Sequence, residues 1–150
     1  MEVNTRAPVV ASSEIVVGAS PEVVWAVLSD VDGWPDWNPG VKTASMDGLL
    51  TVGTSFRWRA GSMMINSVMR EIDTPRTIGW SGQTLRLPAI HVYRIEPCAD
   101  GSLVRTTESW DGLLAVLFKK ALTRYLQRSL DAGLEYLKVE SESRTAGQKS

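Results

Sequence analysis

Hydrophobic and polar positions follow two different periods along the chain, one before and one after residue 112. Between residues 14 and 110, apolar and polar side chains alternate over short runs, which is typical of half-buried β-strands. From residue 113 to about residue 140, apolar positions recur every three or four residues, which indicates one long amphipathic helix. A shorter helix is predicted to begin at Pro21, which suits a first helical turn that Ser20 can cap.

Short turns separate the predicted strands. The strongest turn signals are Asp47-Gly48, Gly61 and Asp100-Gly101. The predicted strands cover residues 14–17, 41–46, 55–59, 63–72, 77–80, 90–95 and 103–110. Strands at this spacing favour an antiparallel meander, and the long apolar helix face needs the sheet as its partner. The predicted fold class is therefore α+β, with a curved antiparallel sheet wrapped around a C-terminal helix and an internal cavity between them.

Composition adds limits to this picture. The 150 residues make one domain of ordinary size, predicted over residues 1–141, and the polar residues 142–150 are expected to form a disordered tail. A formal net charge of −1 gives no general sign of a nucleic-acid or membrane partner. The single cysteine, Cys98, excludes an internal disulfide, and the absence of a ligand cluster predicts no metal and no other cofactor.

Location and assembly are predicted from what the sequence lacks. The first residues carry Glu2 and no basic segment followed by an apolar core, so no secretory signal is expected. The longest apolar run, residues 113–118, is too short to insert across a bilayer. We therefore expect a cytoplasmic protein that is a monomer or a weak homodimer, because no specific dimerisation signal is present.

The segment Trp34-Pro35-Asp36-Trp37-Asn38-Pro39 is the most unusual part of the chain. It is too aromatic for an idle surface loop and too rich in proline for a long helix. Two large rings so close in sequence favour closure over something apolar, such as a ligand. The alternative is that the segment only plugs the end of the core.

Several motifs together resemble the START-like, helix-grip superfamily, and most of all its bacterial polyketide cyclase/dehydrase-type proteins. The matching motifs are PEVVW at 21–25, LSD at 28–30, WPDWNP at 34–39, GTSFRW at 53–58, IGW at 78–80, HVY at 91–93, GSLV at 101–104 and ESWDG at 108–112. The resemblance implies a helix-grip fold with an internal cavity, and it places Trp34, Trp37 and Asn38 near the cavity entrance as a lid. It leaves function open, because the superfamily holds enzymes, carriers and receptors.

Strand alternation predicts which side chains face such a cavity. Val104 and Trp110 favour burial, so the same face should carry Thr106 and Glu108 inward. A register slip of one residue would instead turn Glu108 outward and Arg105 inward. The predicted ligand-contacting residues are Trp37, Asn38, Phe56, Trp58, Trp80, His91, Tyr93, Thr106, Glu108, Trp110, Leu117 and Tyr125.

His91, the only histidine, is the candidate base of a proton-transfer site. With Glu108 as its acid partner and Tyr93 as hydroxyl donor to a carbonyl oxygen, it could serve an aldol-type cyclisation or a dehydration. The structural alternative is that His91 makes one hydrogen bond in a pocket wall and that Glu108 pairs with an arginine at the mouth.

Three functions follow from these predictions. The first is binding of a hydrophobic small molecule, such as a lipid, a polyketide or an aromatic metabolite, in the cavity. The second is a polyketide cyclase/dehydrase-type enzyme that uses His91 and Glu108. The third is a protein-interaction module. Other chemistries are disfavoured, since the chain has no G-x-S-x-G turn and no lysine-containing phosphate loop.

Overall fold

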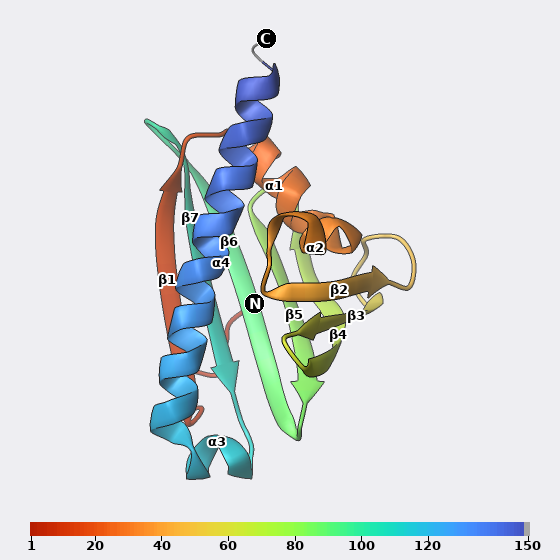
Figure 1. Ribbon diagram of the computed structural model, residues 1–150, viewed down its shortest axis with the longest axis vertical. Helices are drawn as coiled ribbons and strands as arrows, with labels where there is room; N and C mark the ends of the chain where they lie inside the picture. Colours follow the sequence, from red (N-terminus) through yellow and green to blue (C-terminus); the bar gives the residue numbers. More distant parts are fainter. Residues whose placement is uncertain (149–150) are drawn as a thin grey trace.

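A seven-stranded antiparallel sheet and a long C-terminal helix form the body of the computed structural model, which describes residues 1–148 (Figure 1). The strands are β1 (Val9–Val17), β2 (Val41–Met46), β3 (Ser55–Ala60), β4 (Met63–Asp73), β5 (Thr77–Thr84), β6 (Leu87–Cys98) and β7 (Gly101–Trp110). The helices are α1 (Pro21–Ser29), η1 (Val31–Gly33), α2 (Trp34–Trp37), α3 (Leu113–Leu117) and α4 (Lys119–Gln148). The predicted α+β class and the single curved sheet are confirmed.

The strand order is β1-β7-β6-β5-β4-β3-β2, so strands that are neighbours in sequence pair from β2 to β7. The exception is β1, which pairs with β7 at the far edge from β2. The segment from α1 to α2 connects β1 at one edge of the sheet to β2 at the other edge. Register shifts in the β2–β3 and β4–β5 pairs mark bulges, which bend strands and help the sheet to curve around α4.

Local sequence signals account for α1. Its first turn is closed by a hydrogen bond from the Val23 amide to the Ser20 hydroxyl, 3.4 Å, with Pro21 at the first position. Val24, Val27 and Leu28 are buried and form the apolar face of the helix. The helix packs against α4 and β6, so it closes one end of the molecule.

The long C-terminal helix differs from its prediction at both ends. The predicted single helix is interrupted at Phe118, and residues 113–117 form the separate helix α3. At the other end, residues 142–148 are helical, so the expectation of a disordered tail from residue 142 is wrong for them, and residues 149–150 lie outside the described residues. The extra turns carry an ion pair between Arg144 and Glu140, four residues apart, at 3.0 Å.

The apolar core consists of two separate clusters. One lies beneath α1 and α2 and includes Leu134 and Leu137 of α4. The other lies at the opposite end of α4, where Leu126 and Leu130 meet Val9, Leu87 and Ala115. Within residues 1–148, no helix is both long enough and apolar enough to cross a membrane.

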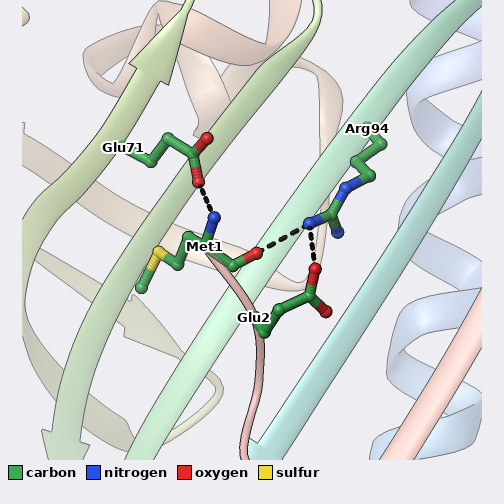
Figure 2. A network of polar contacts seen from close by, with 4 residues as sticks. All are labelled: Met1, Glu2, Glu71 and Arg94. Atoms are coloured by element: carbon green, nitrogen blue, oxygen red, sulfur yellow. Dashed lines mark hydrogen bonds and ion pairs between the residues drawn. The ribbon is translucent and has the colours of Figure 1, made fainter.

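The first residues of the chain lie against the sheet (Figure 2). The Met1 amino group pairs with the Glu71 carboxylate, and the Met1 carbonyl oxygen accepts a hydrogen bond of 2.6 Å from Arg94. Arg94 also pairs with Glu2 at 3.0 Å. Gly79 allows this close approach, since a Cβ atom there would lie 2.7 Å from the Met1 sulfur. The network ties the N-terminus to β4 and β6.

Candidate functional site

A cavity of about 530 Å³ lies between α4 and the sheet. Its wall includes residues of both core clusters, for example Trp34 of one and Leu126 of the other, so the cavity occupies the space that separates them. Five of the six tryptophans line it, namely Trp34, Trp37, Trp58, Trp80 and Trp110. A mainly apolar and aromatic wall of this size is typical of a small-molecule site.

Aromatic contacts fix one side of the wall. Trp34 meets Phe56 and Trp58 edge to face, with ring centroids 5.8 and 5.6 Å apart. Its ring also lies 5.4 Å from that of Trp80. The Trp58 indole N–H donates to the Ser67 hydroxyl at 3.2 Å, which orients the ring. These contacts make this side of the cavity a preformed surface.

The segment from Trp34 to Pro39 both plugs the core and borders the cavity. Trp34 is buried, and its indole N–H donates to the Leu28 carbonyl oxygen at 2.9 Å. Trp37 and Asn38 also line the cavity, and Asn38 Oδ1 accepts a hydrogen bond of 2.9 Å from the Gly40 amide. The first part of the segment therefore fills the end of the core, and its second part borders the cavity. Trp34 is buried in the core and also lines the cavity, and it anchors the segment.

A carboxylate and an imidazole meet at the cavity wall. His91 on β6 and Glu108 on β7 are directly paired in the sheet, and both side chains are buried. His91 Nδ1 lies 2.7 Å from Glu108 Oε1, a contact with the distance but not the angle of a hydrogen bond. On its other side, His91 Nε2 shares a hydrogen bond of 2.8 Å with the Thr106 hydroxyl. The sheet holds this polar group in one orientation.

Tyr93 completes the group. Its ring stacks on Trp80 with centroids 5.8 Å apart and lies 4.8 Å from the His91 ring. Burial raises the pKa of the Tyr93 hydroxyl well above its ordinary value, and the nearby Glu108 carboxylate adds to the rise, although a hydrogen bond with Thr106 opposes it. Tyr93 is therefore a neutral hydroxyl that can donate a hydrogen bond at physiological pH.

The arrangement can hold and transfer a proton. Glu108 is the one carboxylate among the described cavity-lining residues, and its partner is His91. The alternative in which Glu108 pairs with an arginine at the mouth is wrong, since Arg105 faces outward and pairs with Glu14 and Glu96 at 3.0 and 3.3 Å. Within residues 1–148, no three His, Cys, Asp or Glu side chains are grouped so that they could hold a metal ion.

Most predicted ligand-contacting residues line the cavity. They are Trp37, Asn38, Trp58, Trp80, His91, Tyr93, Glu108, Trp110 and Tyr125. Three are placed elsewhere. Phe56 lies in the core against Trp34, and Thr106 is covered by His91, which it supports. Leu117 is exposed, because the helix is interrupted at Phe118 and α3 therefore does not continue the apolar face of α4.

Sequence reasoning missed other lining residues. On the sheet these are Met63, Ile65 and Ser67 of β4, which the alternation of that strand could have indicated. On α4 they include Ser129, Gly133 and Tyr136, which share a helix face with the predicted Tyr125. Gly133 could not be predicted as a lining residue from its type, because it has no side chain and borders the cavity only through the open space beside it.

A curved antiparallel sheet that encloses a cavity against one long C-terminal helix is the helix-grip fold that the sequence resemblance implied. The chain belongs to the polyketide cyclase/dehydrase and lipid transport family, whose model matches residues 8–142. A comparison with curated proteins found no match. Family and fold both support the binding of a small molecule in the cavity.

Solved structures share the fold at low sequence identity. Hypothetical protein jhp0584 from Helicobacter pylori is 19% identical, with a TM-score of 0.82 over 91% of this chain and 90% of its own. The Zhui aromatase/cyclase from Streptomyces sp. R1128 is 17% identical, with a TM-score of 0.79 over 91% and 94%. A START superfamily protein from Mycobacterium smegmatis is 16% identical, with a TM-score of 0.78 over 89% and 97%. At these identities the likeness shows the fold alone.

Proposed function

We propose that the protein binds a hydrophobic small molecule, such as a lipid, a polyketide or an aromatic metabolite, and that the ligand's polar end meets His91 and Glu108. The observation that carries this proposal is the cavity of about 530 Å³ with five tryptophans in its wall. The apolar wall favours transfer of a hydrophobic body from water, and the few polar groups give it one orientation. The chain belongs to the polyketide cyclase/dehydrase and lipid transport family, which agrees with a hydrophobic ligand.

Tryptophan fluorescence tests the proposal directly. Purified protein is titrated with oleate, a flavonol and an anthraquinone, as representatives of fatty acids, polyphenols and aromatic polyketides. Saturable quenching or a spectral shift at micromolar concentration is expected for at least one class, because five of the six tryptophans border the cavity. Lack of response to all three classes would contradict binding of such ligands.

A second candidate function is proton-transfer catalysis of the cyclase/dehydrase type. The observation that favours it is the 2.7 Å contact between His91 Nδ1 and Glu108 Oε1 at the wall of the cavity. In a dehydration, the pair would accept a proton from the carbon beside a carbonyl group and give one to the departing hydroxyl group. The products are an alkene and water, and the pair regains its first protonation state. The Tyr93 hydroxyl would donate to the carbonyl oxygen, where negative charge develops.

Two substitutions separate the candidates. Glu108→Gln keeps the shape of the side chain and removes its charge, and His91→Ala removes the imidazole. A binding protein should keep micromolar affinity in both variants and leave the ligand unchanged. An enzyme should bind but lose turnover, which is measured from the ligand's own absorbance after mixing. Glu96→Gln, at an exposed carboxylate on the same strand as His91, is the matched control and should change neither property.

A further inference from the structure

Exposed apolar side chains gather at the corner between α3 and α4. Leu113, Val116, Leu117 and Phe118 are each between 56% and 71% exposed. In α3, Ala115 is fully buried in the cluster with Val9 and Leu87, and Leu114 packs against the same cluster, so two of its five residues attach this helix to the core. Single exposed apolar residues are ordinary, but a contiguous group of large ones marks an interaction surface.

The turn between β5 and β6 extends this surface. Leu85 in the turn is 64% exposed. The next residue, Arg86, lies against the start of α3, because its carbonyl oxygen is 2.7 Å from the position that a Cβ atom of Gly112 would take. Figure 1 shows α3 and the β5–β6 turn at the same end of the molecule, far from the C-terminus. We call Leu85 and residues 113–118 the apolar corner.

Positive charge adjoins the apolar corner. The first turns of α4 carry Lys119, Lys120, Arg124 and Arg128, all exposed, and residues 112–130 contain no Asp or Glu. None of the four cations forms an ion pair within the described part of the chain. The last three are spaced four residues apart, so they share one face of α4. This charge is local, since the chain as a whole has a net charge of −1.

We propose that the apolar corner and these four cations dock the protein on the surface of an anionic lipid bilayer. Apolar side chains at a protruding end of the molecule can enter the boundary between headgroups and acyl chains. Unpaired cations beside them are complementary to anionic headgroups. This docking is peripheral and needs no membrane-spanning helix. It goes beyond the proposed ligand binding and does not depend on which ligand the cavity takes.

The cavity lies close to the docked surface. Tyr125, which is 46% exposed, follows Arg124 on α4 and lines the cavity. Its ring packs at 6.2 Å from that of Trp110, another lining residue. Docking through the apolar corner therefore brings one side of the cavity wall next to the lipid, from which a hydrophobic ligand can enter.

Vesicle sedimentation tests this surface with the intact chain. Vesicles of phosphatidylcholine alone are compared with vesicles that also contain phosphatidylglycerol. The protein should sediment with the mixed vesicles and stay in solution with the neutral ones, and raised salt should weaken binding. Lys120→Glu/Arg124→Glu should lower binding at least about tenfold, because each cation near the surface contributes to it. Leu117→Ser/Phe118→Ser should also lower it, with less dependence on salt.

Matched controls carry the same changes elsewhere. Arg57→Glu/Arg59→Glu makes an equal charge change at exposed positions of β3, and Leu49→Ser/Val52→Ser removes exposed apolar side chains between β2 and β3. Both controls should bind mixed vesicles like the parent protein. All variants should keep the parent circular dichroism spectrum and the cavity fluorescence response in solution.

Three results would overturn the proposal. They are no sedimentation with mixed vesicles, equal sedimentation with neutral vesicles, and equal losses in the corner and control variants. Size-exclusion chromatography identifies the main alternative occupant, a second copy of the chain. If the parent elutes as a dimer, Leu117→Ser/Phe118→Ser as a monomer, and neither binds vesicles, the corner is a dimer interface instead.

Discussion

The indole N–H of Trp34 donates a hydrogen bond to the main-chain carbonyl oxygen of Leu28, with 2.9 Å between the two atoms. The bond is buried and joins the start of α2 to the end of α1. It therefore fixes the position of the segment from Trp34 to Pro39 relative to α1, and with it the position of the Trp37 ring at the cavity.

Trp34→Phe should lower the free energy of unfolding by about 1–3 kcal/mol, because the Leu28 carbonyl oxygen would stay buried without its donor. Trp37→Phe is the matched control, since the Trp37 N–H is buried and has no hydrogen-bond partner in the described structure. Its effect should be clearly smaller. Urea unfolding followed by circular dichroism measures both, and equal losses would show that the Trp34 bond adds no stability.

Gly133 offers a way to fill the cavity. It lies within α4 and lines the cavity, and a Cβ atom there would have no neighbour within 4 Å. Gly133→Ala should stabilise the protein by about 1 kcal/mol through helix propensity. Gly133→Phe should place a ring in the open space and weaken ligand binding at least about tenfold without unfolding the protein.

Ala146→Phe, at an exposed position of α4 outside the cavity wall, is the control for ring size and should leave affinity unchanged. Fluorescence titration of the three variants provides the affinities. Unchanged binding by Gly133→Phe would mean that the ligand does not occupy the cavity.

The raised pKa of Tyr93 makes stability depend on alkaline pH. In the unfolded chain tyrosine loses its proton near pH 10, whereas folded Tyr93 keeps it to higher pH. Above about pH 10 the folded state therefore holds more protons than the unfolded state, and the free energy of unfolding falls as pH rises. Tyr93→Phe should flatten this fall between about pH 10 and pH 11.

Tyr125→Phe is the comparison, since Tyr125 is 46% exposed. Both variants lose one tyrosine hydroxyl, so they are compared with each other and with the parent protein. The measurement is urea unfolding at a series of pH values, and only the difference in slope between variants is used. An unchanged slope in Tyr93→Phe would argue against a buried neutral hydroxyl at this position.

Strand alternation predicted the inward face of β7, which carries Thr106 and Glu108. The clear turn signal at Asp100-Gly101 fixes the phase of β6 and β7, which it joins, and His91 and Glu108 then fall on the same face. The same periodicity could not predict the break at Phe118, because residues 113–118 are apolar and continue the helical pattern. The position of α3 depends on Ala115, which packs in one cluster with Val9 and Leu87 from distant parts of the chain.

The local distribution of charged residues was also more informative than the net charge of the chain. The net charge of −1 does not reveal that residues 112–130 contain no acidic side chain. The apolar corner beside them forms an exposed surface because α3 is a separate helix from α4. Likewise, the volume of the cavity depends on how far the sheet curves. That curvature comes from bulges whose positions no residue type in the sequence marks clearly.

The pairing of β1 with β7 has a consequence for the folding of the chain. Val9 aligns with Trp110, so this edge of the sheet joins segments from near the two ends of the domain. Such non-local pairing slows folding, since a long loop must close before the contact forms. During synthesis the strands from β2 to β6 can pair with their neighbours in order. The cavity acquires its last walls only when β7 and α4 have emerged, so the ability to hold a ligand comes at the end of folding.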